Sequence, residues 1–328
     1  GKESMRIILV VLLGFLLACS EQGVDKIHEI PLSTEIDPTN GKVVGNARQQ
    51  GLREFLGIPY ASAPVGELRW QPPQPIEDWK GKLDATKAGL PCVQPATLSE
   101  FYARAYSETS EDCLTLNVWS RATASSDKLP VMVWIHGGAL VMGSGSDYDG
   151  AALTSKGVVV VTINYRLGPF GFFAHPGLSS ESVDGVSGNQ GFRDQIAALE
   201  WVRDNIENFG GDPENVTIFG ESAGSWSVSV MQASPLARGL FHKVIGQSGA
   251  RFIPIPDLTE DRWGIPSAES WGEKLGAKFT DADGASLETL RSLPAQEIMD
   301  VYAEDPEVLM NFDYLTIVDG AVLPYEVD

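Results

Sequence analysis

Asn215-Val216-Thr217-Ile218-Phe219-Gly220-Glu221-Ser222-Ala223-Gly224 is the stretch of sequence that decides the fold. Its first five residues are mostly β-branched or aromatic, which favours a buried strand. Small residues from Ser222 onward allow the chain to reverse into a helix that we expect to end near Met231. A G-x-S-x-G sequence between a strand and a helix holds its serine on a sharp turn at the carboxyl end of a sheet. We therefore interpret residues 220–224 as a nucleophile elbow rather than an ordinary glycine turn.

A second glycine-rich stretch lies upstream, at Trp134-Ile135-His136-Gly137-Gly138-Ala139, after an apolar run at 131–135 that is typical of a strand. Attack on an ester carbonyl places negative charge on oxygen, and preorganised backbone N–H donors lower that barrier. Glycine lets the backbone approach the oxygen without a Cβ in the way. The elbow's own donor, the N–H of Ala223, needs a partner from such a loop. The pattern therefore predicts an oxyanion-binding loop rather than a strand-ending turn.

The pattern of apolar residues in the rest of the chain predicts alternating strands and helices. Residues 114–119 and 158–163 are typical of strands, the second suited to a central parallel position. Apolar residues recur at helical spacing over 190–209, and Gly210-Gly211 ends that helix. We expect residues before about 110 to be mixed β and loop within the same domain, and 263–313 to be helical and irregular. The fold class is α/β: a doubly wound, mostly parallel sheet with flanking helices.

Several further motifs occur in a fixed order: Phe55-Leu56-Gly57-Ile58-Pro59-Tyr60-Ala61, Pro64-Val65-Gly66, Ser110-Glu111-Asp112-Cys113-Leu114, Asn164-Tyr165-Arg166-Leu167-Gly168, Ser187-Gly188-Asn189, Asp194-Gln195 and Gln247-Ser248-Gly249. With the elbow and the glycine loop, they make the chain resemble the type B carboxylesterases, which include bacterial para-nitrobenzyl esterases and the cholinesterases. The resemblance runs from about Lys42 to the end of the chain. It implies the α/β-hydrolase fold.

The resemblance implies a role for each site residue. Ser222 corresponds to the nucleophile, and Gly138, Ala139 and Ala223 correspond to the oxyanion donors. Ala139 stands where many relatives have glycine, but it still supplies an N–H. Glu221 matches an acidic residue near the active site of relatives. It could equally be a carboxylate favoured at a helix start by the helix dipole.

The rest of a catalytic triad is not evident. In this fold the acid and then the histidine follow the serine, and in relatives both lie beyond the segment that residues 319–324 resemble. The histidines here are His28, His136, His175 and His242. The first three precede Ser222, and His242, in Gly239-Leu240-Phe241-His242-Lys243, is better explained as structural. Glu326 lies in the wrong segment for the acid. We therefore expect a chain truncated at its C-terminus, with these 328 residues inactive alone.

The N-terminus resembles that of an exported lipoprotein. We expect residues 1–4 to be an upstream extension or a cloning scar, and residues 5–18 to be a signal peptide, whose apolar run is too short to span a membrane. Leu16-Leu17-Ala18-Cys19 looks like a bacterial lipobox that leaves Cys19 lipidated; an ordinary secretory signal with a chance cysteine is the alternative. The domains are then a tether at 19–40 and a hydrolase domain at 41–328. We expect a lipid-anchored protein of the bacterial cell envelope, facing the periplasm or the outside.

The chain has three cysteines, and lipidation of Cys19 would account for the odd one. The resemblance pairs Cys92 with Cys113 as the family's first disulfide, which an oxidising compartment permits. Two reduced thiols are the alternative. The loop between them carries Phe101, Tyr102 and Tyr106 but no tryptophan, which argues against choline esters as substrates. These aromatics either line the entrance to the site or pack the loop down.

The net charge and the spacing of metal-binding residue types limit the partners and cofactors that we expect. A net charge of −20 disfavours nucleic acid and anionic membrane surfaces as partners, so we expect membrane contact only through the lipid at Cys19. We expect no cofactor and no metal, because no residues have metal-ligand spacing. The expected partner is a small-molecule carboxylic ester, hydrolysed by the full-length protein through an acyl-enzyme. A non-catalytic, esterase-like binding protein of the same fold is the alternative.

Overall fold

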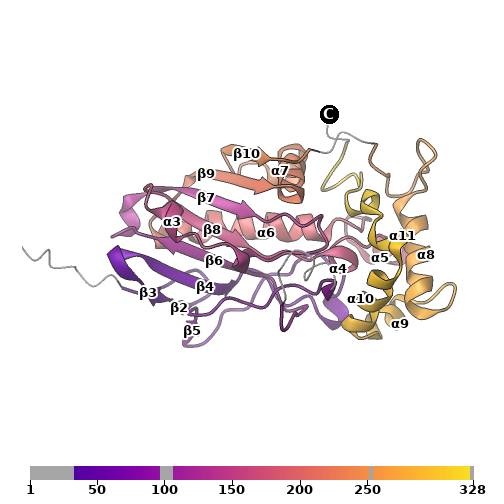
Figure 1. The fold of residues 1–328 in the computed structure, drawn as a ribbon, viewed down its shortest axis with the longest axis horizontal. Helices are drawn as coiled ribbons and strands as arrows, with labels where there is room; N and C mark the ends of the chain where they lie inside the picture. Colours follow the sequence, from indigo (N-terminus) through magenta and orange to yellow (C-terminus); the bar gives the residue numbers. More distant parts are fainter. Residues whose placement is uncertain (1–32, 97–105, 251–253, 326–328) are drawn as a thin grey trace, which may run out of the picture. The chain divides into compact units, whose positions relative to one another are not determined.

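A seven-stranded sheet forms the centre of the part of the chain that the computed structural model describes, residues 33–96, 106–250 and 254–325 (Figure 1). These residues fall in one compact unit that begins at Ser33. The strand order across the sheet is β10-β9-β7-β8-β6-β4-β3. In chain order the strands are β3 (Asn46–Ala47), β4 (Arg53–Pro59), β6 (Thr115–Ser120), β7 (Leu129–Ile135), β8 (Val159–Ile163), β9 (Gly211–Glu221) and β10 (Lys243–Gln247).

The sheet is mixed rather than mostly parallel. Strands β10, β9, β7 and β8 run parallel to one another, whereas β6, β4 and β3 each pair antiparallel with the preceding neighbour in the sheet. The parallel half is where helices connect successive strands, as parallel pairing requires. β8 is buried at all five positions, as expected, but it is parallel only to β7.

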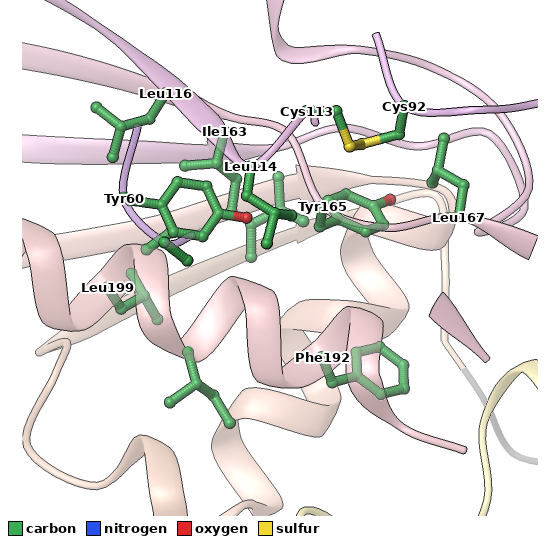
Figure 2. Packing of buried hydrophobic residues seen from close by; sticks show 14 of the residues in the cluster. Tyr60, Cys92, Cys113, Leu114, Leu116, Ile163, Tyr165, Leu167, Phe192 and Leu199 are labelled. Atoms are coloured by element: carbon green, nitrogen blue, oxygen red, sulfur yellow. A yellow bond between two sulfur atoms is a disulfide. The ribbon is translucent and has the colours of Figure 1, made fainter. Parts of the chain in front are cut away.

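Helix α6 (Gln190–Asn205) packs against the sheet and contributes to the apolar core. Phe192 and Leu199 point from this helix into the cluster of buried apolar residues that also contains Leu116 and Ile163 of the sheet (Figure 2). The expected helix over 190–209 is therefore confirmed, although its last turn is the tighter 3₁₀ segment Ile206–Phe209. Gly210 ends it with a φ of 82°, a left-handed conformation that glycine adopts without strain.

The other elements surround this sheet. A small second sheet contains β1 (Glu35–Ile36), β2 (Lys42–Val44) and β5 (Lys82–Asp84). Helices α8, α9, α10 and α11 lie together on the side toward which the arrows of β7 and β9 point (Figure 1), so the expected helical character of 263–313 is confirmed. The remaining helices are α3 (Ala151–Thr154), α4 (Gly168–Gly171), α5 (Pro176–Glu181), α7 (Ala223–Ala233), α8 (Ala268–Thr280), α9 (Leu287–Ser292), α10 (Ala295–Glu304) and α11 (Pro306–Leu309).

Two arginines hold α9 against the rest of the unit. The Arg69 guanidinium donates to both carboxylate oxygens of Glu111 at 2.7 Å, and to the carbonyls of Arg291 at 3.1 Å and Leu293 at 2.7 Å. Arg291 in turn donates to the Glu181 carboxylate at the end of α5. Since Arg69 is nearly fully buried, these charge-assisted bonds are shielded from water. We call this group the arginine clasp.

The Cys92–Cys113 disulfide expected from the resemblance is present, with the two Cα atoms 5.1 Å apart. Both cysteines are buried within the main apolar cluster, near the labelled Leu114 and Tyr165 in Figure 2. Phe101 and Tyr102 in the loop between the cysteines lie outside the described residues, whereas Tyr106 donates its hydroxyl to Asp147 at 2.6 Å.

The proposed signal peptide, the tether up to residue 32 and Cys19 lie outside the described residues, as does Glu326. Residues 35–36, which we expected to belong to the tether, form strand β1. Across 33–96, 106–250 and 254–325, no helix has the length and apolar character needed to cross a bilayer.

We expect that replacing Cys92 and Cys113 together by alanine will lower the free energy of unfolding by about 3 kcal/mol, because the disulfide closes a loop 21 residues long in the unfolded chain. Urea denaturation of the oxidised protein and of the double variant measures this difference. The wild-type protein kept reduced should match the variant; equal stability of the oxidised and reduced proteins would contradict the expectation.

Candidate active site

Ser222 lies on the turn between β9 and α7, with φ 55° and ψ −122°. A non-glycine residue rarely adopts this backbone conformation, which costs of order 1–3 kcal/mol. The turn is held by hydrogen bonds on both sides: the Ser222 N–H donates to the carbonyl of Gln247 at 2.8 Å, and the Ser222 carbonyl accepts from the N–H of Ser225 at 2.9 Å. The sharp elbow expected from the sequence is therefore present.

Glycines are required where β9 and α7 cross. A Cβ added at Gly224 would lie 2.1 Å from the carbonyl oxygen of Ile135 in β7, and one added at Gly220 would lie 2.5 Å from the Gly224 backbone. A Cβ added at a third glycine, Gly249, two residues after β10 ends, would lie 2.3 Å from the Ser222 carbonyl oxygen. Because backbone fills each of these places, no side chain can move aside to make room.

The glycine loop after β7 lies directly against this elbow. We define residues 137–143 as the oxyanion loop. A Cβ added at Gly137 would lie 3.2 Å from the Ser222 Cβ and 2.6 Å from the Glu221 carbonyl oxygen. The backbone then turns through positive φ at Gly138 (110°) and Ala139 (54°). The left-handed conformation at Ala139 gives a physical reason why a glycine would also suit this position.

Hydrogen bonds to three carbonyls set the direction of the neighbouring N–H groups. In a planar trans peptide, the C=O of one residue and the N–H of the next point in opposite directions. The Gly138 carbonyl accepts from Val141 and Met142 inside the loop, both at 3.0 Å, so the Ala139 N–H points out of the loop. The Ser222 carbonyl accepts from within α7, so the Ala223 N–H points out of the helix N-terminus.

The Gly138 N–H is set in the same way. The ring Nδ1 of His136 lies 2.8 Å from the Gly137 carbonyl, and since a carbonyl only accepts, Nδ1 carries the proton. The N–H of Gly138 therefore points away from the His136 ring. Within the described residues, none of the N–H groups of Gly138, Ala139 and Ala223 donates a hydrogen bond to the protein. Such donors are suited to an oxyanion.

Glu221 is exposed and lies beside the oxyanion loop. Its carboxylate oxygen Oε2 would be 3.2 Å from a Cβ added at Gly137. Glu221 is the last residue of β9, and it precedes the first residue of α7 by two positions. This location is compatible with both roles considered for it, a residue near the site and a carboxylate favoured by the helix dipole.

The three described histidines have structural roles. His136 is buried and stacks on Tyr165 with ring centres 4.4 Å apart. His175 accepts from the Gly177 N–H at the start of α5, and burial lowers its pKa. His242 accepts from the N–H of Val216, six residues before Ser222 along β9, which places it about 20 Å from the serine. His242 is therefore not the base for Ser222, and His28 lies outside the described residues.

Trp226 of α7 is partly buried and packs against the apolar core. Among the described residues, no group of three or more histidine, cysteine, aspartate or glutamate side chains could hold a metal ion.

The sequence did not indicate two buried residues that support the oxyanion loop. Tyr165 donates its hydroxyl to the His136 carbonyl at 2.8 Å, and the Gln94 amide bonds to Gly143. Tyr165 lies within the motif Asn164-Tyr165-Arg166-Leu167-Gly168, which indicates the family but does not indicate this contact. The only sequence signal at Gln94 is its position two residues after Cys92, because its contact with residue 143 is long-range.

Comparisons with known proteins find relatives over most of the chain. The model of the carboxylesterase family matches residues 32–327. Fumonisin B1 esterase of Sphingopyxis macrogoltabida is 48% identical over 228 residues, covering 69% of this chain and 41% of that protein. Para-nitrobenzyl esterase of Bacillus subtilis (strain 168) is 52% identical over 213 residues, covering 64% of this chain and 42% of that protein.

The crystal structure of the carboxylesterase EST55 of Geobacillus stearothermophilus superposes with a TM-score of 0.76 at 40% identity. The match covers 89% of this chain and 57% of that chain. It confirms the α/β-hydrolase fold. The chain spans less than half the length of the two curated esterases.

We expect Gly224→Ala to destabilise the elbow, because the added methyl group would overlap the Ile135 carbonyl. A loss of about 1–3 kcal/mol is typical of forced overpacking, and the displaced Ser222 should react more slowly with a fluorophosphonate. Gly276→Ala in α8 is the matched control, since its added Cβ would meet only side-chain atoms at 3.5 Å or more. Thermal unfolding and labelling rates test both; a Gly224→Ala protein as stable and reactive as the control would contradict the crossing constraint.

Proposed function

Because the chain belongs to the carboxylesterase family, we propose that it is the nucleophile-bearing part of a serine hydrolase that cleaves carboxylic esters through an acyl-enzyme. The observation that carries this proposal is the strained backbone of Ser222 beside the outward-pointing N–H groups of Gly138, Ala139 and Ala223. These groups belong to two different segments that the fold brings into contact.

In the proposed reaction, the Ser222 Oγ attacks the ester carbonyl carbon as its proton passes to a base. The carbonyl oxygen becomes an oxyanion, which the three N–H groups stabilise. The tetrahedral intermediate collapses, the alcohol leaves with a proton, and the acyl group stays on Ser222. Water then repeats the sequence and releases the acid. In this proposal a histidine outside the described residues is the base, since His136, His175 and His242 are engaged elsewhere.

A non-catalytic binding protein of the same fold is less well supported. Holding Ser222 at φ 55° costs stability, and three N–H groups that have no acceptor among the described residues serve no packing purpose there. Both features are useful to an enzyme that binds an oxyanion, whereas neither is needed to bind a partner with the surface of the protein.

The proposed substrate is a small-molecule carboxylic ester. Two relatives are named as esterases for fumonisin B1 and for a para-nitrobenzyl ester, and this supports the ester class without fixing the acyl or alcohol part. The absence of tryptophan from the sequence between Cys92 and Cys113 argues against choline esters.

We also propose that the protein is exported and anchored to the cell envelope by a lipid on Cys19. The disulfide between Cys92 and Cys113 supports an oxidising compartment, and the apolar run followed by Cys19 supports lipidation. In this proposal the lipid is the protein's only membrane contact, because a net charge of −20 disfavours anionic lipid surfaces.

We expect a fluorophosphonate probe to label Ser222 in the full-length gene product, and Ser222→Ala to abolish both labelling and hydrolysis of para-nitrophenyl butyrate. The physical reason is that no other group carries the covalent step. Ser225→Ala is the control, because its hydroxyl donates to the Gly249 carbonyl at 2.6 Å; this variant should still be labelled. Peptide mass spectrometry that finds the probe on another serine would overturn the assignment.

For the anchor, we expect Cys19→Ala to move the protein from the membrane fraction to the soluble fraction of the expressing bacterium, because a lipid chain can no longer be attached. Metabolic labelling with a palmitate analogue should mark the wild-type protein and not the variant. A wild-type protein that is soluble and carries no palmitate label would argue for an ordinary, cleaved secretory signal instead.

A further inference from the structure

The buried side chain of Gln94 joins the disulfide segment to the oxyanion loop. Gln94 is 5% exposed and lies two residues after Cys92. Its Oε1 accepts from the Gly143 N–H at 2.8 Å, and its Nε2 donates to the Gly143 carbonyl at 3.1 Å. The same Nε2 donates to the Cys92 carbonyl at 2.9 Å. One amide group therefore satisfies both backbone groups of one residue in the loop.

Gly143 is the residue through which the end of the loop touches its beginning. A Cβ added there would lie 2.6 Å from His136 Nδ1 and 2.8 Å from the Gly137 carbonyl oxygen. These are the two atoms whose hydrogen bond sets the direction of the Gly138 N–H. A displacement of Gly143 would therefore act directly on the peptide that carries an oxyanion donor.

We propose that Gln94 is a positioning residue that fixes the oxyanion loop through Gly143 and is itself held in place by the Cys92–Cys113 disulfide. This inference rests on the proposed function, because it assigns Gln94 to the machinery of the same reaction. Gln94 does not touch the reacting atoms. It acts by holding N–H donors where charge develops in the transition state, a requirement that affects turnover more than substrate binding.

The alternative is that Gln94 only stabilises the fold. Replacing any buried amide side chain leaves its hydrogen-bond partners unsatisfied, and this lowers the free energy of unfolding by about 1–3 kcal/mol wherever in the fold the amide lies. Asn205 offers a matched control. It is similarly buried, and its amide bonds to the Thr39 N–H and the Trp201 carbonyl. Asn205 is the last residue of α6 and lies six residues before the start of β9, whereas Ser222 follows the other end of that strand.

The test compares Gln94→Met with Asn205→Leu in the full-length gene product, assayed with para-nitrophenyl butyrate. Both variants remove a buried amide while keeping its approximate volume, so both should lower the melting temperature. We expect Gln94→Met to lower kcat by at least about 10-fold with KM changed less than about 3-fold, since losing a whole oxyanion donor costs about 100-fold or more. Asn205→Leu should leave both constants unchanged. Equal kcat in Gln94→Met and the wild type, or equal losses in both variants, would overturn the proposal.

Gln94→Glu gives a second test if the methionine variant fails to fold. A protonated carboxyl group can accept from the Gly143 N–H and donate to the Gly143 carbonyl, as the amide does, whereas a carboxylate can only accept. Burial raises the pKa of such a carboxyl. The kcat of Gln94→Glu relative to wild type at the same pH should therefore rise as the pH falls from 8 to 6. A ratio independent of pH would contradict the proposal.

A double-mutant cycle tests the link to the disulfide. If the disulfide holds Gln94, the kcat of Gln94→Met should fall little further when Cys92 and Cys113 are also replaced by alanine. Additive losses would show that the disulfide does not act through Gln94. If the fluorophosphonate probe failed to label Ser222 in the wild-type protein, the proposed function itself would be refuted. Failure of the proposed function can therefore be told apart from failure of the Gln94 proposal.

Discussion

The close crossing of β9 and α7 is the constraint on which the candidate site depends. Backbone atoms of Ile135, Gly220 and Gly224 approach one another so closely that no Cβ fits between them. Because the chain must reverse within this space, the residue at the corner is forced to a positive φ, and that residue is Ser222. The strain is local, but the stability that sustains it comes from the buried strands on both sides.

The same crossing also explains why N–H groups point outward at the candidate site. Parallel strands β7 and β9 end together, with Ile135 opposite Gly220, so the loop after one and the helix after the other begin at the same edge. At that edge, the carbonyls of Gly138 and Ser222 accept hydrogen bonds from within the loop and the helix. The N–H of the residue that follows each carbonyl therefore points outward. The outward direction of these N–H groups is thus a by-product of ordinary loop closure and helix initiation.

The features of the fold and the candidate site that could be predicted from the sequence are those encoded by residues close together in the chain. The elbow, the helix over 190–209 and the glycine loop are encoded by neighbouring residues, and the structure has all three. The disulfide followed from the family resemblance. The mixed character of the sheet was missed because strand direction depends on pairing between distant segments such as β4 and β6. The Gln94 contact was missed for the same reason, since 49 residues separate it from Gly143. The roles of Ser222, Gly138, Ala139 and Ala223 remain predictions.

The arginine clasp has a consequence for sequence divergence. Arg69 holds the end of α9 through the main-chain carbonyls of Arg291 and Leu293, and not through their side chains. Every amino acid provides such a carbonyl. Substitutions can therefore accumulate at the exposed positions of α9 while the bonds from Arg69 persist, provided that the buried Leu290 and the Arg291 side chain on Glu181 are kept. A lineage could in this way vary the exposed surface of α9 without losing the contacts beneath it.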